Sequence, residues 1–311
     1  MIDTHCHLQF NAYKNDYEAV IKRCMDKGVI LNVVGSQKDT SARAVAYAEK
    51  NKNIYATVGL HPIHLFKSHV DESEAKFDSR AEDFDYDYYK NLAQNKKVIA
   101  IGECGLDFFH QPEGMSREDV LKKQKETFLA QYELAQELDL PLVIHVRDPK
   151  PEALLRFGAG AHEEMVELLT VIASKAKQSQ NNERIAASPS APRNDNTIRG
   201  VIHCYTANWH YAQKYLDLGL HLGFTGVITF PPKKTDPQSQ LDLLEVVAKC
   251  PLGRLLTETD APYLAPQAYR GQRCEPWMVE EVIKKIAEVK GVSPEEVVAI
   301  TTKNAKALFN L

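Results

Sequence analysis

The feature that most constrains this chain is a strand-like run of apolar, β-branched residues that recurs eight times along its length. Most of these runs precede a segment with the 3.6-residue periodicity of an amphipathic helix. Strand–helix alternation of this kind predicts parallel strands joined by right-handed crossovers. The expected strands are 1–8, 29–35, 54–61, 98–107, 141–147, 200–206, 221–228 and 254–262.

Eight such units favour an α/β fold in which the strands close into a (β/α)8 barrel of the TIM type. An open, doubly wound sheet is the competing arrangement. We expect residues 1–311 to form a single barrel domain, although this length also allows two ordinary domains. Residues 174–199 break the pattern, because they are polar and rich in Pro, Ser and Asn. They predict a flexible surface insertion within the barrel.

The composition is that of an ordinary soluble globular protein, with 44% hydrophobic and 26% charged residues. A net charge of −4 provides no global attraction to nucleic acid. The six cysteines are scattered and include no C-x-x-C pair, which predicts free thiols in a reducing compartment. No apolar stretch is long enough to cross a bilayer, and no export signal is recognisable. We therefore expect a cytoplasmic protein with no membrane partner, and nothing indicates an obligate protein partner.

Side chains that can bind metal ions stand at or near the carboxyl ends of five predicted strands. In a barrel these ends converge on one face, where active sites are built. Five separate strands that each end in a ligand-type residue are hard to attribute to chance, so we expect a metal site on that face. The candidate ligands are His5, His7, Glu103, His145, His203 and Asp260.

The alternation of side chains along a strand refines this set. His5 and His7 point to the same face, whereas Cys6 between them points to the other. By the same alternation, Cys104 and Cys204 should face the helices as buried core residues rather than bind a metal. Ligands that offer only nitrogen and carboxylate oxygen suit Mg²⁺, Mn²⁺ or Zn²⁺. Asp3 lies deeper on the ligand face, where we expect it to brace a histidine.

Seven short motifs follow one another along the chain: DTHCHL, VGLHP, IGECGLDF, LPLVIHVRD, GVIHCYT, LLTETDAPYLAP and RGQRCEP. In this order they resemble the TatD family of metal-dependent deoxyribonucleases, and the similarity spans nearly the whole chain. The resemblance implies a (β/α)8 barrel of the amidohydrolase-like superfamily with a divalent-metal centre that is often binuclear. One departure is HCYTAN, where relatives usually show HCF followed by a small residue and Gly. This departure bears on substrate preference, because it leaves the ligands intact.

The resemblance also implies roles for individual residues. One divalent ion would be held by the N-terminal pair of histidines with Asp260, and a second by His145 and His203, with Glu103 bridging the two. Mg²⁺, Mn²⁺ and Zn²⁺ all stay open as the metal. Asp260 and Glu103 are the expected catalytic residues, because Asp260 can both bind a metal ion and accept a proton from the attacking water.

Three further side chains on this face are expected to contact the substrate. His61, in VGLHP, is interpreted as a substrate contact or a donor to a ligand rather than a ligand itself. Arg147 lies two residues beyond His145 and shares its face. Arg273 belongs to the loop after the eighth strand. Both arginines are candidate phosphate contacts.

These patterns predict a divalent-metal-dependent hydrolase. The favoured activity is that of a deoxyribonuclease that cleaves phosphodiester bonds of single-stranded or frayed DNA, exonuclease-like, through a metal-activated water. A hydrolase of a small ester or amide is the alternative. Enzymes that bridge two metals through a carbamylated lysine on the fourth strand are disfavoured, because that strand offers Glu103 and no nearby lysine. A non-catalytic binding protein is disfavoured by the complete ligand set.

Overall fold

Eight parallel strands form one sheet in which each strand pairs with the next along the chain. The structure is a computed structural model that describes residues 1–67, 81–150, 159–183 and 198–311. The strands are β1 (Ile2–Cys6), β2 (Ile30–Val34), β3 (Ile54–Val58), β4 (Val98–Asp107), β5 (Leu142–Arg147), β6 (Gly200–Ile202), β7 (His221–Phe224) and β8 (Leu255–Thr257).

The sheet closes because the segment that follows β8 pairs with β1. The His7 amide donates to the carbonyl of Ala261 at 2.7 Å, and the Asp260 amide donates to the carbonyl of His5 at 2.9 Å. Cys6 and Ala261 form a parallel bridge between the same segments. The predicted (β/α)8 barrel is therefore confirmed, and the open, doubly wound sheet is excluded.

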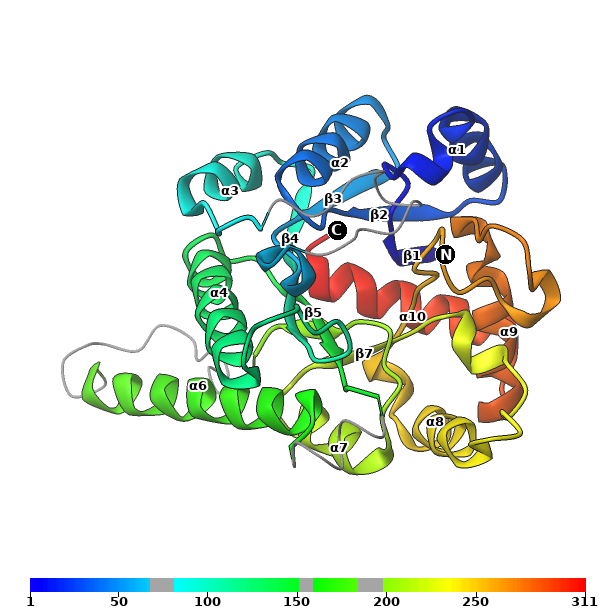
Figure 1. The fold of residues 1–311 in the computed structure, drawn as a ribbon. Coiled ribbons are helices and arrows are strands. Elements are labelled where there is room, and N and C mark those ends of the chain that lie inside the picture. Colours follow the sequence, from blue (N-terminus) through cyan, green and yellow to red (C-terminus); the bar gives the residue numbers. More distant parts are fainter. Residues whose placement is uncertain (68–80, 151–158, 184–197) are drawn as a thin grey trace.

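Helices surround the barrel, as the alternating pattern requires (Figure 1). Several begin at a polar residue whose side chain accepts a hydrogen bond from the third residue beyond it, as in Ser116, Asn208 and Ser293. The helices of the described residues are α1 (Tyr17–Asp26), α2 (Lys38–Lys50), α3 (Tyr86–Ala93), α4 (Arg117–Glu137), α6 (Ala161–Glu183), α7 (Trp209–Asp217), α8 (Pro237–Lys249), α9 (Val279–Lys290) and α10 (Pro294–Phe309).

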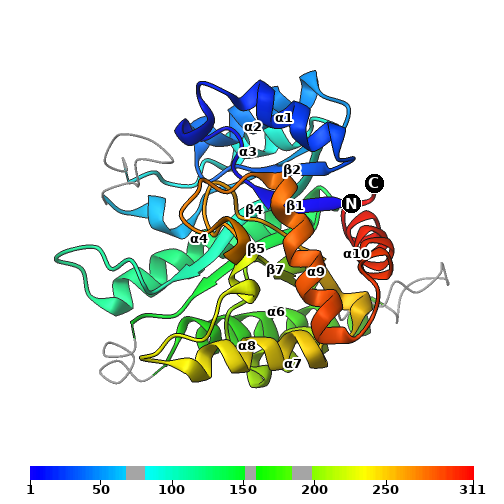
Figure 2. The ribbon, with the colours of Figure 1, turned by 90° about the vertical axis from the view of Figure 1, so that its right-hand side faces the viewer.

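The last helix, α10, closes one end of the barrel, where both chain termini also lie (Figure 2). Apolar residues of α10 and of the strands form a separate buried cluster there: Ile2, Ile99, Ala100, Val143, Val201, Leu256, Ala305, Leu308 and Phe309. We call this end the floor and the opposite, carboxyl end of the strands the mouth. Packing α10 across the floor leaves the mouth as the end that can admit a ligand.

Two sequence predictions need correction in detail. Several strands are shorter than their apolar runs, and β6 and β8 each have three residues. The first part of the predicted insertion at 174–199 is helical rather than irregular, because α6 continues through Glu183. Residues 184–197 of that prediction lie outside the described residues. None of the described helices is long and apolar enough to cross a bilayer.

Candidate metal centre at the mouth of the barrel

Glu103, in the second half of β4, is the centre of a cluster of ionisable side chains, and it is only 4% exposed. One carboxylate oxygen, Oε2, lies 3.3 Å from Nε2 of His5 and 3.8 Å from Nε2 of His7. The other, Oε1, lies 2.9 Å from Nδ1 of His145 and 3.9 Å from Nε2 of His203. The two carboxylate oxygens therefore face two different sets of histidines.

Asp260 faces the same cluster from the segment after β8. Its Oδ1 atom lies 3.4 Å from Nε2 of His7, 3.6 Å from Nε2 of His203 and 3.9 Å from Nε2 of His5. The backbone of Asp260 is left-handed, with φ of 58°, a conformation that aspartate tolerates better than most residues. All six candidate ligands thus lie together, brought there by five strands.

Polar groups behind the cluster orient three of its histidines. Nδ1 of His7 lies 2.7 Å from the carbonyl oxygen of Val34, which can only accept a hydrogen bond. Nδ1 of His203 lies 2.8 Å from the carboxylate of Glu258. In both rings the outer Nδ1–H donates, so Nε2 is the nitrogen left to bind a metal ion, as metal-binding histidines require. His145 is held similarly, because its Nε2 lies 3.0 Å from a carboxylate oxygen of Asp107.

Two of these supporting residues, Asp107 and Glu258, were not predicted from the sequence. Asp107 is 1% exposed and also accepts hydrogen bonds from the amides of Phe109 and His110. Glu258 is fully buried and accepts from the amide of Cys204. Their positions in the sequence could have indicated this role. Each lies an even number of residues from a candidate ligand on the same strand or its extension, and such a spacing places both side chains on one face.

Electrostatic coupling keeps the carboxylates of this cluster ionised. Burial opposes ionisation of Glu103, but the surrounding histidines, His61 and His5 foremost, hold its pKa well below its usual range. Burial likewise opposes ionisation of Asp260, and hydrogen bonds from His203 and His7 lower its pKa. The pKa of His145 is raised to about 9 despite burial, because Asp107 and Glu103 both accept from its ring. Both Glu103 and Asp260 are therefore present as ionised carboxylates.

The donor atoms suit a small divalent cation. In three overlapping triads of described residues, all donor atoms lie within 4.8 Å of one another: His5, His7 and Asp260; His5, Glu103 and His203; His61, Glu103 and His145. Imidazole nitrogen and carboxylate oxygen are ligands for Zn²⁺ and Mn²⁺, and carboxylate oxygen also for Mg²⁺. The buried Nδ1 atom of His5 has no hydrogen-bond partner among the described residues. The cluster is thus polar, preassembled and chemically matched to metal ions.

The cysteine predictions have different outcomes. Cys6 and Cys104 pack into the apolar core between barrel and helices, as predicted. The prediction for Cys204 is wrong, because its sulfur lies within 4.8 Å of donor atoms of His203 and Asp260. Strand β6 ends at Ile202, and the φ angle of Cys204 is 45°, so the alternation of a strand no longer governs its side chain. Burial raises the pKa of its thiol to about 12, which keeps it protonated.

The three predicted substrate contacts lie in different surroundings. His61 belongs to the cluster, with Nε2 3.5 Å from Oε1 of Glu103. Arg147 ends β5 as an exposed side chain, 4.0 Å from the ring centre of Phe109.

Arg273 is engaged elsewhere. Its guanidinium donates two hydrogen bonds to Asp16, at 2.8 and 2.7 Å, and one to Glu275 at 3.2 Å. Bidentate pairing of this kind leaves few donors for a phosphate. The structure therefore does not favour the predicted role of Arg273.

Asp3 lies beneath the cluster and is fully buried. It accepts hydrogen bonds from the amide of His5 at 3.2 Å and from the amide and hydroxyl of Thr259, at 2.9 and 2.6 Å. It thereby ties β1 to the segment that carries Asp260. This geometry agrees with the expectation that Asp3 braces the site.

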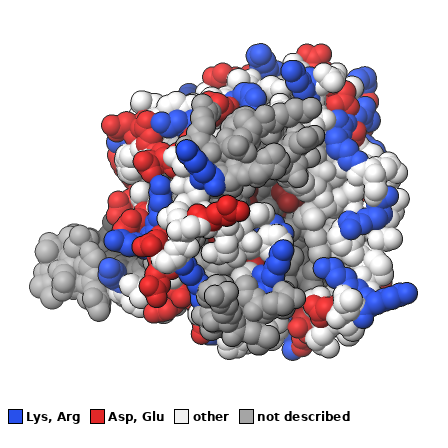
Figure 3. Space-filling model, in the orientation of Figure 1, with Lys and Arg blue, Asp and Glu red and all other residues white. Residues whose placement is uncertain are grey.

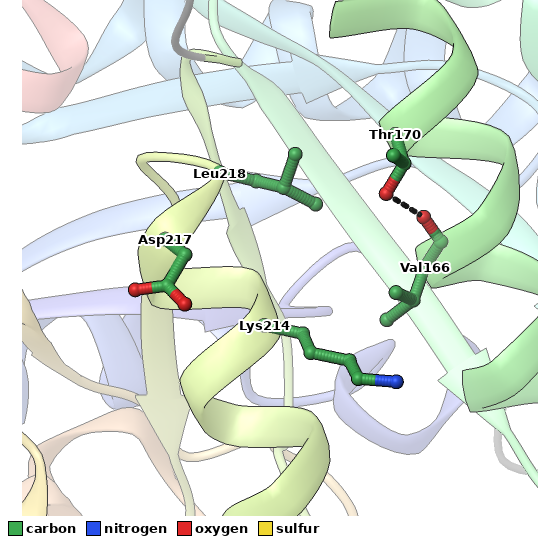
Figure 4. A pocket seen from close by; sticks show the side chains of 5 residues that line it. All are labelled: Val166, Thr170, Lys214, Asp217 and Leu218. Carbon is green, nitrogen blue, oxygen red and sulfur yellow. Dashed lines mark hydrogen bonds between the residues drawn. The ribbon is translucent and has the colours of Figure 1, made fainter.

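The surface around the mouth carries mixed charge. Figure 3 shows this end of the molecule, with a central hollow and with Lys and Arg scattered among Asp and Glu rather than gathered in one field. A separate hollow of about 330 Å³ lies on the outer surface between α6 and α7. It is lined by Val166, Thr170, Lys214, Asp217 and Leu218, and the Thr170 hydroxyl is bonded within its own helix (Figure 4). This outer hollow contains none of the clustered side chains.

Comparison with known proteins gives consistent matches over the full chain. The model of the family described as TatD related DNase matches residues 2–310. The uncharacterized metal-dependent hydrolase YabD of Bacillus subtilis is 34% identical over all of this chain and 99% of its own length. The 3'-5' ssDNA/RNA exonuclease TatD of Erwinia amylovora is 30% identical over the full length of both chains.

A solved structure agrees with the sequence matches. The crystal structure of YjjV, a TatD homologue of Escherichia coli K12, superimposes with a TM-score of 0.73 at 25% identity. The match covers all of this chain and 98% of that one. Fold and sequence therefore point to the same group of proteins.

Proposed function

Because the chain belongs to the TatD family of metal-dependent hydrolases, we propose that it is a nuclease that cleaves phosphodiester bonds of single-stranded or frayed DNA from an end. The name of the Erwinia relative, a 3'-5' ssDNA/RNA exonuclease, supports this substrate class. The observation that carries the proposal is the Glu103 carboxylate, whose two oxygens face separate sets of histidines. A carboxylate placed in this way could bind one ion through each oxygen, as in centres that hold two metal ions close together.

The proposed ligands follow from the two sides of Glu103. His5, His7 and Asp260 would hold one ion, and His145 with His203 the second. Bound there, divalent ions supply Lewis acidity and lower the pKa of coordinated water toward neutrality. The identity of the ions, among Mg²⁺, Mn²⁺ and Zn²⁺, and their number of two are part of the proposal.

The side chains of the chain itself have distinct tasks in this scheme. Asp260 accepts the proton of the attacking water through its carboxylate, which faces His7 and His203. Arg147, exposed at the rim, binds a phosphate beside the one that is cleaved. Glu103 keeps its charge between the two sets of histidines. Hydrolysis in this scheme needs no covalent intermediate on the protein.

The decisive assay uses purified protein and end-labelled single-stranded DNA, with and without Mg²⁺ or Mn²⁺. We expect metal-dependent cleavage that a chelator abolishes and that Asp260→Asn reduces by at least about 10³-fold, since a metal ligand and proton acceptor is lost. Equal cleavage by wild type and Asp260→Asn would reveal a contaminating nuclease. No cleavage with any metal would overturn the proposal.

A small ester or amide is the competing substrate. This alternative is supported by the mixed charge around the mouth, because the described residues in Figure 3 form no broad basic surface that would guide a long nucleic acid strand. A parallel assay with p-nitrophenyl esters and phosphodiesters separates the two. Activity on carboxylic esters without cleavage of DNA would favour the alternative.

A further inference from the structure

The histidines of the cluster differ in the direction of the hydrogen bond made by the outer ring nitrogen. In His7 the outer nitrogen faces a backbone carbonyl oxygen, and in His203 it faces a carboxylate. Neither oxygen can donate, so both rings carry a proton on the outer nitrogen, and each ring in its neutral form offers a lone pair inside. This is the arrangement of a metal ligand.

His61 has the opposite arrangement. Its Nδ1 atom accepts a hydrogen bond from the backbone amide of Ile63, at 3.2 Å. A backbone amide can only donate, so Nδ1 holds a lone pair and the ring carries its proton on Nε2. That Nε2 atom is the one directed at Glu103, 3.5 Å from Oε1. The ring therefore offers the cluster a hydrogen-bond donor.

The backbone holds His61 in this state. Its amide donates to the carbonyl of Ser36 at 2.8 Å. The preceding residue, Leu60, is fixed by the side chain of Gln131 in α4, which accepts from its amide at 2.8 Å and donates to its carbonyl at 3.0 Å. His61 caps the short helix η2 (Pro62–Leu65), whose first residue is a proline with a restricted φ. The side chain is 9% exposed, so little space remains for the ring to turn.

We propose that His61 is a fixed hydrogen-bond donor that binds a non-bridging phosphate oxygen of the substrate through Nε2–H, and that it is not a metal ligand. The inference rests on the proposed function for the identity of the substrate. The ring lies edge-on to that of His145, with centres 4.2 Å apart, so the oxygen it binds is held beside Glu103 and His145. A prepositioned donor gains strength as negative charge develops on that oxygen.

The proton position is tested directly by ¹⁵N NMR of histidine-labelled protein, with and without Zn²⁺, and needs no activity. We expect His61 to show a protonated Nε2 and an unprotonated Nδ1 in both states, whereas His7 and His203 show a protonated Nδ1 and an unprotonated Nε2 once Zn²⁺ is bound. Assignment uses the variants His61→Gln and His7→Gln. A protonated Nδ1 in His61, or a Zn²⁺-dependent shift typical of a bound Nε2, would overturn the proposal.

The role is tested by variants with a metal titration. The variant His61→Phe removes the donor and keeps a planar ring, whereas His61→Gln keeps an N–H group. The matched control is His210→Phe, at an exposed position of α7. We expect unchanged metal stoichiometry in all three and a kcat lower by about 10²–10³-fold in His61→Phe. We expect a smaller loss in His61→Gln and none in His210→Phe. Loss of one metal equivalent in His61→Phe would contradict the proposal.

A phosphorothioate substrate separates this role from a structural one. Sulfur accepts hydrogen bonds weakly, so replacing the contacted oxygen should slow the wild type and largely remove its advantage over His61→Phe. If the wild type stays faster than His61→Phe by the same factor with both phosphorothioate stereoisomers, the proposed contact between His61 and a phosphate oxygen is contradicted. If the wild type cleaves no DNA, the proposed function fails, whereas the NMR and metal titration still decide whether His61 is a donor. If the wild type cleaves DNA and His61→Phe is as fast, only the donor role fails.

Discussion

The two ends of the barrel are built from the same eight strands but from opposite kinds of side chain. At the floor, aliphatic residues of the strands pack against α10, as Val143 and Val201 do near Leu308 and Phe309. At the mouth, buried histidines and carboxylates lie within a few ångströms of one another. The strands therefore pass from an apolar core at one end to a cluster of charge at the other.

This difference separates stability from activity. Burying apolar surface at the floor contributes to the free energy of unfolding, at about 25 cal/mol per Å². Burying ionisable groups at the mouth costs free energy unless each group finds a partner. The left-handed backbone of Cys204 and of Asp260 adds local strain at the mouth. We expect substitutions at the floor to change stability and substitutions at the mouth to change activity.

The largest expected effect is that of Glu103→Gln at the mouth. The amide keeps the shape of the side chain but removes the charge that faces both sets of histidines. We expect cleavage to fall by more than about 10³-fold, or about 4 kcal/mol in the barrier. Denaturant unfolding of the metal-free variant should differ from wild type by no more than about 1–2 kcal/mol. A large loss of stability with normal activity per folded molecule would contradict this separation of stability from activity.

The opposite result is expected for Leu308→Ala at the floor. Leu308 is 4% exposed, and its truncation leaves a cavity between α10 and the strands. We expect a loss of about 3 kcal/mol in the free energy of unfolding, read from the urea midpoint. Metal stoichiometry and kcat of the folded protein should be unchanged. Leu311→Ala, at the partly buried chain end, is the control and should cost much less.

The floor and the strand order could be predicted from the sequence, because apolar runs with helical segments between them report burial directly. The six clustered residues could also be predicted, since position at a strand end and side-chain chemistry are both visible in the sequence. The polar composition of the first part of 174–199 did not predict a helix. These residues are helical because they continue α6, which is stabilised by the packing of its early turns as well as by the propensity of its later residues.

Other features depended on geometry that the sequence does not display. The side chain of Cys204 turned toward the cluster because β6 stops two residues earlier. Arg273 was expected at the substrate, but Asp16, from a loop over 250 residues away in sequence, binds its guanidinium. Which nitrogen of His61 carries the proton is set by the amide of Ile63, and only coordinates reveal that contact.

A smaller effect at the mouth is expected for Glu258→Gln. Glu258 is not among the proposed metal ligands, but its carboxylate orients His203 through Nδ1 at 2.8 Å. We expect metal affinity or activity to fall by about 10–100-fold, the usual effect of removing such a support. Asp107→Asn should act comparably through His145. Metal titration by calorimetry distinguishes this from a direct ligand loss, because the number of bound ions should stay the same.

The smallest expected effect concerns His221, which begins β7 near the floor. Burial and, after it, the positive charge of Arg254 lower its pKa from 6.5 to about 4. The unfolded chain therefore binds a proton below pH 6.5 that the folded chain binds only near pH 4, so this group destabilises the fold as pH falls through that window. The substitution His221→Gln removes this penalty. We therefore expect its effect on the free energy of unfolding to be more favourable at pH 5 than at pH 8 by about 1 kcal/mol, after allowance for solvent screening. Urea unfolding of metal-free wild type and variant at both pH values measures this difference. The titration of the mouth histidines cancels in it, because both proteins contain them. An equal effect of the substitution at both pH values would show that folding does not lower the pKa of His221, and would contradict this prediction.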